Sequence, residues 1–171
     1  ELSLNSKPQL AGARKIGISP LENEYPLYHY NWVQNNLKKV DKASNGRIGY
    51  IYIPDMGPEG LNEFSRYFYP QLDKEGLIID DRAIGGGNVS PMILERLSRE
   101  PYRLTMGRGT KRVGTIPDAV QVGPKVCLIN KYSASDGDLF PWGFRALGLG
   151  KLIGTRTWGG IVGISGPLPY M

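Results

Sequence analysis

The chain has 171 residues and a net charge of +5, and 40% of its residues are hydrophobic and 22% charged. This length and composition suit one domain, or one domain with a short appendage, that buries a real hydrophobic core. One cysteine and one histidine exclude a disulfide framework and a Cys/His metal site, and we expect neither a metal nor a cofactor.

The first part of the chain is polar and irregular as far as residue 25, and only the segment 15–21 is apolar enough to predict a short strand. Residues 27–40 then carry apolar side chains at helical spacing, which predicts a helix. The Ser-Asn-Gly sequence at 44–46 follows this helix and is a strong turn signal.

From residue 47 onward, apolar runs typical of buried strands alternate with segments of helical spacing. We expect strands at 47–55, 76–81, 125–130 and 150–155, and helices at 59–72, 88–100 and 135–147. Ser90 is the expected N-cap of the second of these helices, with Pro91 at its first position. Such alternation is typical of an α/β fold with largely parallel strands.

Basic residues are spread along the chain except in the stretch RLTMGRGTKR at 103–112. This stretch is expected to be a solvated loop, and the alternative is a nucleic-acid surface. No aromatic stacking platform accompanies it, so we expect no nucleic-acid partner. Cys127 lies in the apolar run 126–129 and is expected to be a small buried residue.

Three consecutive glycines, Gly85, Gly86 and Gly87, follow the predicted strand at 76–81 and precede a predicted helix. One interpretation is a tight turn that needs positive φ. The spacing matches neither Gly-x-Gly-x-x-Gly nor a P-loop, which argues against nucleotide binding. The alternative is that a backbone N–H of this turn stabilises a developing negative charge on a substrate oxygen.

Ser135 stands between a predicted strand and a predicted helix, in the stretch NKYSASDGDLFPWGF of residues 130–144. It fits a capping box, with Asp138 three residues further on. It also fits a nucleophile on a strand-to-helix turn similar to Gly-x-Ser-x-Gly, in which the N–H of Asp136 points the same way as the hydroxyl. A tetrahedral oxyanion could then be held between this N–H and that of a glycine. Ser133 is the local competitor and is expected to be a turn residue, and no base is evident nearby.

A further glycine-rich stretch, GTRTWGGIVG at 154–163, predicts either a β-turn with a packed indole or a loop that lines the same cleft. Together these segments resemble the tricorn protease family of serine peptidases, which is related to the C-terminal processing peptidases. The matching stretches follow in family order from residue 46 to about residue 164: GRIGYIYIPDMGPEGLNEFSRYFYPQLDKEGLIID, GGGNVS, SASDGD and LGLGKLIGTRTWGGIVGI.

The resemblance implies a crotonase/ClpP-like ββα superhelix, which agrees with the alternation of strands and helices. It implies a peptidase catalytic core at 27–171, truncated at its C-terminal end, and it makes 1–26 the end of a PDZ-like domain or a linker. It also implies that Ser135 is the nucleophile. The backbone N–H groups of Gly87 and Asp136 would then form the oxyanion hole.

The resemblance does not extend to a base. The processing peptidases use a lysine where this chain has Gly160, and the tricorn branch uses a histidine from an upstream domain, held by a serine and a glutamate. His29 does not match that pattern, so we expect the base and the glutamate outside these residues. Around Leu104 and Thr105 the chain lacks the acidic residue that the family links to basic P1 side chains, and Ile84 replaces the usual asparagine.

The leading hypothesis is therefore a serine peptidase core that cleaves peptides by acyl transfer through Ser135 and is inactive on its own. The alternative is a non-catalytic peptide-binding or scaffold fragment of the same fold. The expected partner is a peptide substrate, and a homo-oligomer is left open. No apolar stretch approaches the about 18 residues of a membrane span. The compartment is left open between cytoplasm and periplasm.

Overall fold

The computed structural model describes residues 1–110 and 113–161. Lys111 and Arg112 of the predicted basic loop lie outside the described residues, as do the last residues of the predicted catalytic core. The chain divides into two compact units, Glu1–Val33 and Gln34–Met171. The assignment of the first residues to a PDZ-like domain stays a prediction.

The first unit holds a short antiparallel pair of strands, β1 (Leu2–Leu4) and β2 (Arg14–Ile16). Compared with the predicted strand at 15–21, the observed strand β2 begins one residue earlier and ends five residues earlier. Helix α1 (Tyr25–Ser44) begins in this unit and ends in the second. In its first turns His29 stacks between Tyr25 and Trp32, with ring centroids 5.9 and 6.0 Å apart.

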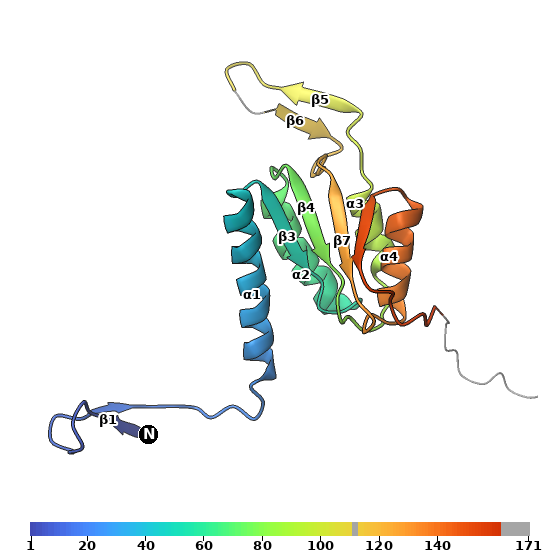
Figure 1. Cartoon of the computed structure of the whole chain (residues 1–171). Coiled ribbons are helices and arrows are strands. Elements are labelled where there is room, and N and C mark those ends of the chain that lie inside the picture. Colours follow the sequence, from blue (N-terminus) through green and yellow to red (C-terminus); the bar gives the residue numbers. More distant parts are fainter. Residues whose placement is uncertain (111–112, 162–171) are drawn as a thin grey trace, which may run out of the picture. The chain divides into compact units, whose positions relative to one another are not determined.

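The second unit is built on a four-stranded parallel sheet, which confirms the α/β prediction (Figure 1). The order along the sheet is β3-β4-β7-β8, so each strand lies beside the preceding strand of this sheet in the chain. The strands are β3 (Ile48–Tyr52), β4 (Gly76–Asp80), β7 (Lys125–Ile129) and β8 (Gly150–Gly154).

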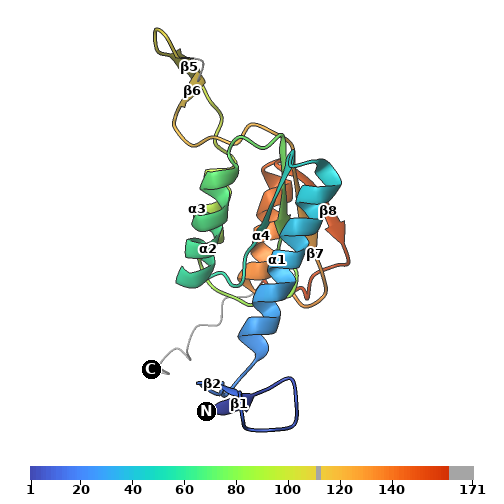
Figure 2. The same ribbon diagram turned by 90° about the vertical axis from the view of Figure 1, so that its left-hand side faces the viewer.

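Helices connect successive strands of the sheet and gather on one of its faces (Figures 1 and 2). They are α2 (Pro58–Phe68), α3 (Ser90–Leu97) and α4 (Asp136–Ala146), and the short 3-10 helix η1 (Tyr69–Gln71) follows α2. Because each crossover advances in the same direction, right-handed connections place all three α-helices on the same side. Within the described residues, no helix is long and apolar enough to cross a membrane.

The hydrophobic core lies between the sheet and these helices. Cys127 is fully buried in it, as predicted, and burial raises the pKa of its thiol well above the usual value. The sheet contributes alternate residues and the helices contribute mostly phenylalanine and leucine. The core side chains include Ile51, Ile53, Leu77, Ile79, Phe64, Phe68, Ile93, Leu97, Phe140 and Phe144.

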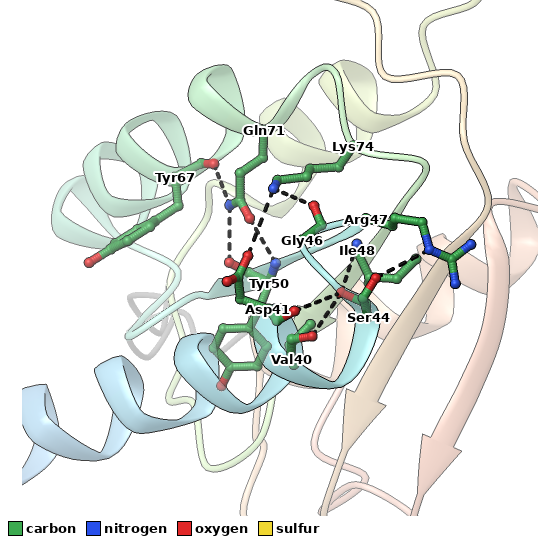
Figure 3. A network of polar contacts seen from close by, with 10 residues as sticks. All are labelled: Val40, Asp41, Ser44, Gly46, Arg47, Ile48, Tyr50, Tyr67, Gln71 and Lys74. Atoms are coloured by element: carbon green, nitrogen blue, oxygen red, sulfur yellow. Dashed lines mark hydrogen bonds and ion pairs between the residues drawn. The ribbon is translucent and has the colours of Figure 1, made fainter.

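The free edge of β3 is closed by a side chain rather than by another strand (Figure 3). The Gln71 Oε1 accepts a hydrogen bond from the Tyr50 N–H at 2.9 Å, and its Nε2 donates to the Tyr50 carbonyl at 3.1 Å. The same Nε2 donates to the Tyr67 carbonyl at 2.6 Å. The Gln71 amide thereby pairs with the edge-strand backbone groups that would otherwise be open to another chain.

An antiparallel hairpin interrupts the alternation, formed by β5 (Arg103–Met106) and β6 (Val113–Ile116). The prediction of a solvated loop at 103–112 is therefore wrong for its first four residues. All four residues of β5 are exposed, so the strand has no buried face to produce an apolar alternation. Its structure comes from pairing with β6, which the local sequence does not reveal.

Candidate active site

Three loops meet where the adjacent strands β4, β7 and β8 end. The carboxyl ends of parallel strands lie at the same edge of the sheet, so the segments that follow them are neighbours. The Ala134 N–H donates to the Ile84 carbonyl at 3.0 Å, and the Trp158 N–H donates to the Ser133 carbonyl at 2.9 Å. The three glycine- and serine-rich segments singled out in the sequence are thus brought together.

Ser135 lies immediately before α4 with φ 58° and ψ −117°. A residue with a side chain rarely adopts such a positive φ, and strain of this kind costs about 1–3 kcal/mol and clusters at functional sites. The residue is exposed, and within the described residues its hydroxyl has no hydrogen-bond partner. Ser135 holds the N-cap position, but the predicted capping bond from its side chain is absent, which leaves the hydroxyl open to a ligand.

Asp136 is 2% exposed, and its carboxylate joins the start of α4 to the start of α3. It accepts hydrogen bonds from the Ser90 backbone N–H at 3.0 Å and from the Ser90 hydroxyl at 2.5 Å. The prediction of Ser90 as an N-cap is therefore wrong. Val89 holds that position, and the Ser90 hydroxyl is used in this tertiary contact instead.

Asp138 attaches the loop after β8 to the first turn of α4. Its two carboxylate oxygens accept hydrogen bonds from the N–H groups of Gly159 (2.8 Å) and Gly160 (2.9 Å). Burial raises the pKa of this carboxyl, but hydrogen bonds from the Thr157 hydroxyl and from the N–H groups of Gly159, Gly160 and Ser135 outweigh burial and lower the pKa below its usual value. The bond from the Ser135 N–H is the second half of a capping box.

The glycine turn approaches Ser135 through Gly86. A Cβ atom added at Gly86 would lie 2.9 Å from both the Cβ and the Oγ of Ser135. Gly87 is one residue further on, with φ +158°, and it forms a bridge with Met56 whose carbonyl a Cβ at Gly87 would strike. Glycine is therefore required at 86 by the serine side chain and at 87 by the backbone.

Two backbone N–H groups are available near Ser135. Among residues 1–110 and 113–161, the N–H groups of Gly87 and Asp136 have no acceptor. The N–H of Asp136 is at the first position of α4, where the helix dipole favours negative charge. The assignment of these two groups to an oxyanion hole stays a prediction.

Ser133 differs from Ser135 in every respect that matters for a nucleophile. It is fully buried, and its hydroxyl donates a hydrogen bond to the Asp81 carbonyl at 2.5 Å. Asn130 supports the same region, because its Oδ1 accepts from the Ala83 N–H (3.0 Å) and the Tyr132 N–H (3.1 Å). Ala83 has a positive φ of 60°, a second strained residue in this site.

The described residues contain no group of three metal-binding side chains. Within these residues the Ser135 hydroxyl donates no hydrogen bond to a base, and His29 belongs to the other unit of the chain. Sequence reasoning missed the contact of Gly86, the role of Asp138 as a link, and the burial of Asp81. The two aspartates that flank Gly137 were a signal for tight polar anchoring of α4.

Comparisons with known proteins agree with this geometry. Residues 47–170 match the model of peptidase family S41. The chain is 47% identical over 151 residues to the tricorn protease of Thermoplasma volcanium, which covers 86% of this chain and 14% of that protein. It is 44% identical over 155 residues to the tricorn protease of Thermoplasma acidophilum, covering 89% of this chain and 14% of that protein.

Solved structures give the same result. A crystal structure of the tricorn protease is 43% identical and has a TM-score of 0.83, covering 90% of this chain and 15% of that one. A putative peptidase from Parabacteroides merdae is 26% identical with a TM-score of 0.51, over 68% of this chain and 42% of that one. The chain thus spans about a seventh of the tricorn proteases that it matches. It belongs to peptidase family S41, and within this family it is similar to the tricorn proteases.

Proposed function

We propose that this chain is the nucleophile-bearing core of a serine peptidase, which hydrolyses peptides through an acyl-enzyme on Ser135. The observation that carries the proposal is the state of Ser135. It is exposed, its backbone is strained, and its hydroxyl has no partner among the described residues, beside the N-terminus of α4. Backbone strain of this kind clusters at catalytic and other functional positions.

The neighbouring groups suit acyl transfer. The hydroxyl of Ser135 attacks the peptide carbonyl carbon, and the N–H groups of Asp136 and Gly87 stabilise the oxyanion that forms. Such backbone donors are already in place before the reaction, and one donor is typically worth a factor of about 10²–10³ in kcat. The close approach of Gly86 keeps the glycine turn beside the nucleophile.

The proposed reaction needs a base that the described residues do not supply. A nucleophilic serine requires a group that accepts its proton, and general base catalysis is typically worth about 10²–10⁴-fold. We therefore propose that the base comes from a part of the protein outside these 171 residues, and that the peptide is bound without a metal or cofactor. The isolated chain then has little or no peptidase activity.

Covalent labelling tests the nucleophile directly. A fluorophosphonate probe, applied to the longest natural form of the protein, is expected to label Ser135, as located by peptide mass spectrometry. Ser135→Ala abolishes labelling and peptide hydrolysis, whereas Ser98→Ala, at a serine whose hydroxyl donates to the Glu95 carbonyl, leaves both unchanged. Peptide binding without labelling of Ser135 would instead favour a non-catalytic peptide-binding protein of the same fold.

A further inference from the structure

Strand β4 ends at Asp80 and is followed by Asp81, and these two acidic residues are both fully buried but have different surroundings. The Asp80 carboxylate accepts hydrogen bonds from the Tyr50 hydroxyl at 2.6 Å and from the Arg82 Nε at 2.8 Å. Within the described residues, neither carboxyl oxygen of Asp81 has a hydrogen-bond partner. Burying an ionised carboxylate without partners is far more costly than burying the neutral acid.

The side chain of Asp81 belongs to the core face of the sheet. Its N–H donates to the Leu128 carbonyl at 2.9 Å, which continues the ladder between β4 and β7 by one residue. Since side chains alternate along a strand, Asp81 shares the face of Leu77 and Ile79, which are core residues. Cys127, the partner of Ile79 on β7, is nearby and uncharged, because burial raises the pKa of its thiol.

The charged groups around Asp81 are carboxylates. Burial raises the pKa of Asp81 well above its usual value, the negative charges of Asp80, Asp138 and Asp136 raise it further, and the nearby Ser133 hydroxyl opposes the rise only in part. The other three carboxylates have their own donors, as described above. The one cation attached to this group, the Arg82 guanidinium, is paired with Asp80 in the described part of the chain.

We propose that Asp81 is a positioning residue that works as a neutral carboxylic acid. Protonation gives the Asp81 carboxyl an O–H that can turn to the nearby Ser133 hydroxyl oxygen as its acceptor. The Ser133 hydroxyl itself donates to the Asp81 backbone carbonyl. The Ser133 carbonyl accepts a hydrogen bond from the Trp158 N–H. Through its hydroxyl and its carbonyl, Ser133 therefore holds the turn that carries Ser135 against the loop after β4 and the loop after β8. The catalytic consequence rests on the proposed function of Ser135, but the protonation state does not.

The pH dependence of stability tests the protonation state. If folded Asp81 keeps its proton while the unfolded chain releases it, folding binds one proton above pH about 4. The raised pKa then favours the folded state at low pH, and this advantage is lost as the pH rises toward the folded value. Urea unfolding of the full chain from pH 5 upward is expected to give a wild-type unfolding constant that rises tenfold per pH unit relative to Asp81→Asn, until the pH reaches the folded pKa of Asp81.

Asp80→Asn is the matched control, since the adjacent aspartate is equally buried but has donors. It is expected to be less stable than the wild type by a factor that stays constant at the acidic end of this range, where Asp81 keeps its proton in both forms. A constant ratio for Asp81→Asn, like that for Asp80→Asn, means that Asp81 is ionised in the folded protein and overturns the proposal.

Kinetics test the positioning role in the longest natural form of the protein. Asp81→Leu, which cannot donate to Ser133, is expected to lower kcat at least tenfold with little change in KM. Asp81→Asn supplies an N–H donor and is expected to restore most of this loss. It is also expected to remove the fall in rate that the proposal predicts for the wild type as the pH rises through the folded pKa of Asp81. Equal losses in the two variants, with an unchanged pH profile, would contradict positioning by Asp81 even where the stability result holds.

Failure of Ser135 as nucleophile leaves the stability result unaffected, so the two proposals fail separately.

Discussion

At the scale of single residues, the glycine turn offers a test of how closely the site is packed. Gly86→Ala places a Cβ atom 2.9 Å from the Ser135 hydroxyl oxygen, so the nucleophile or the turn must move. A displacement of about 1 Å at a reacting group can cost a factor of about 10² in rate. The expected result is a loss of that size in kcat/KM for a peptide, in a variant that still unfolds cooperatively in urea.

The neighbouring Gly85 provides the control, because a Cβ atom there meets no other atom within 4 Å. Gly85→Ala is expected to keep nearly full activity. Equal activity of the Gly85→Ala and Gly86→Ala variants would show that the turn does not hold Ser135.

A second prediction for a single residue concerns how the stabilisation by the Asp138 carboxylate depends on pH. The pKa of its carboxyl is lowered in the folded protein, so the stabilisation that it provides is present above the unfolded value of about 3.9 and is lost as the pH falls through the folded value. Asp138→Asn is expected to reduce the hydrogen-exchange protection of the Gly159 and Gly160 amides at neutral pH, because an amide has one acceptor oxygen. The stability difference from the wild type shrinks below pH 4. Asp118→Asn, at an exposed aspartate, leaves this protection unchanged.

At the scale of elements, the edge of β3 depends on one side chain. Gln71→Leu removes both partners of the Tyr50 backbone groups, and unsatisfied buried polar groups cost about 1–3 kcal/mol. We expect the free energy of unfolding to fall by about that amount in urea titrations. Lys74→Met, which removes the bond to the Gly46 carbonyl and a long ion pair with Asp41 near the same edge, is expected to cost less than 1 kcal/mol. Equal losses in the two variants would mean that Gln71 does not protect the edge.

The elements show which information the local sequence carries. The buried strands and the amphipathic helix α2 are visible in it, because the spacing of their apolar residues follows from which face they bury. The hairpin of β5 and β6 is not visible, since its exposed residues have no buried face. Ser90 was misjudged for a related reason. Its hydroxyl bonds Asp136, which is 46 residues away in the chain and adjacent only in the fold.

The segments that form the site were predictable from the sequence, but the tertiary contacts that hold them in place were not. The glycine turn and Ser135 each carried a local signal, and parallel strands explain why they meet. The contacts of Gly86 with Ser135 and of Asp138 with Gly159 depend on tertiary distances, which no local pattern encodes. Asp81 looked like the end of a strand, and what distinguishes it from Asp80 is that its buried carboxyl has no hydrogen-bond partner in the described part of the chain.

At the scale of the whole molecule, the proposed function makes this chain a nucleophile-bearing core whose base lies elsewhere in the protein. The chain spans about a seventh of the tricorn proteases it matches, so there is room in such a protein for the missing group. Within the described residues, Ser135 is held by an arrangement of buried carboxylates and backbone bonds that does not require that group to be present. A correctly folded but inactive core is the expected state of these 171 residues.

Peptide hydrolysis by the 171-residue chain, measured beside the longest natural form of the protein, tests this claim most directly. We expect the long form to hydrolyse peptides and Ser135→Ala to abolish this activity. The 171-residue chain is expected to be slower by at least the factor of about 10²–10⁴ that a general base provides. Robust hydrolysis by the 171 residues alone, lost in Ser135→Ala, would place the base within the chain and contradict the account. Hydrolysis by the long form that survives Ser135→Ala would contradict the assignment of the nucleophile itself.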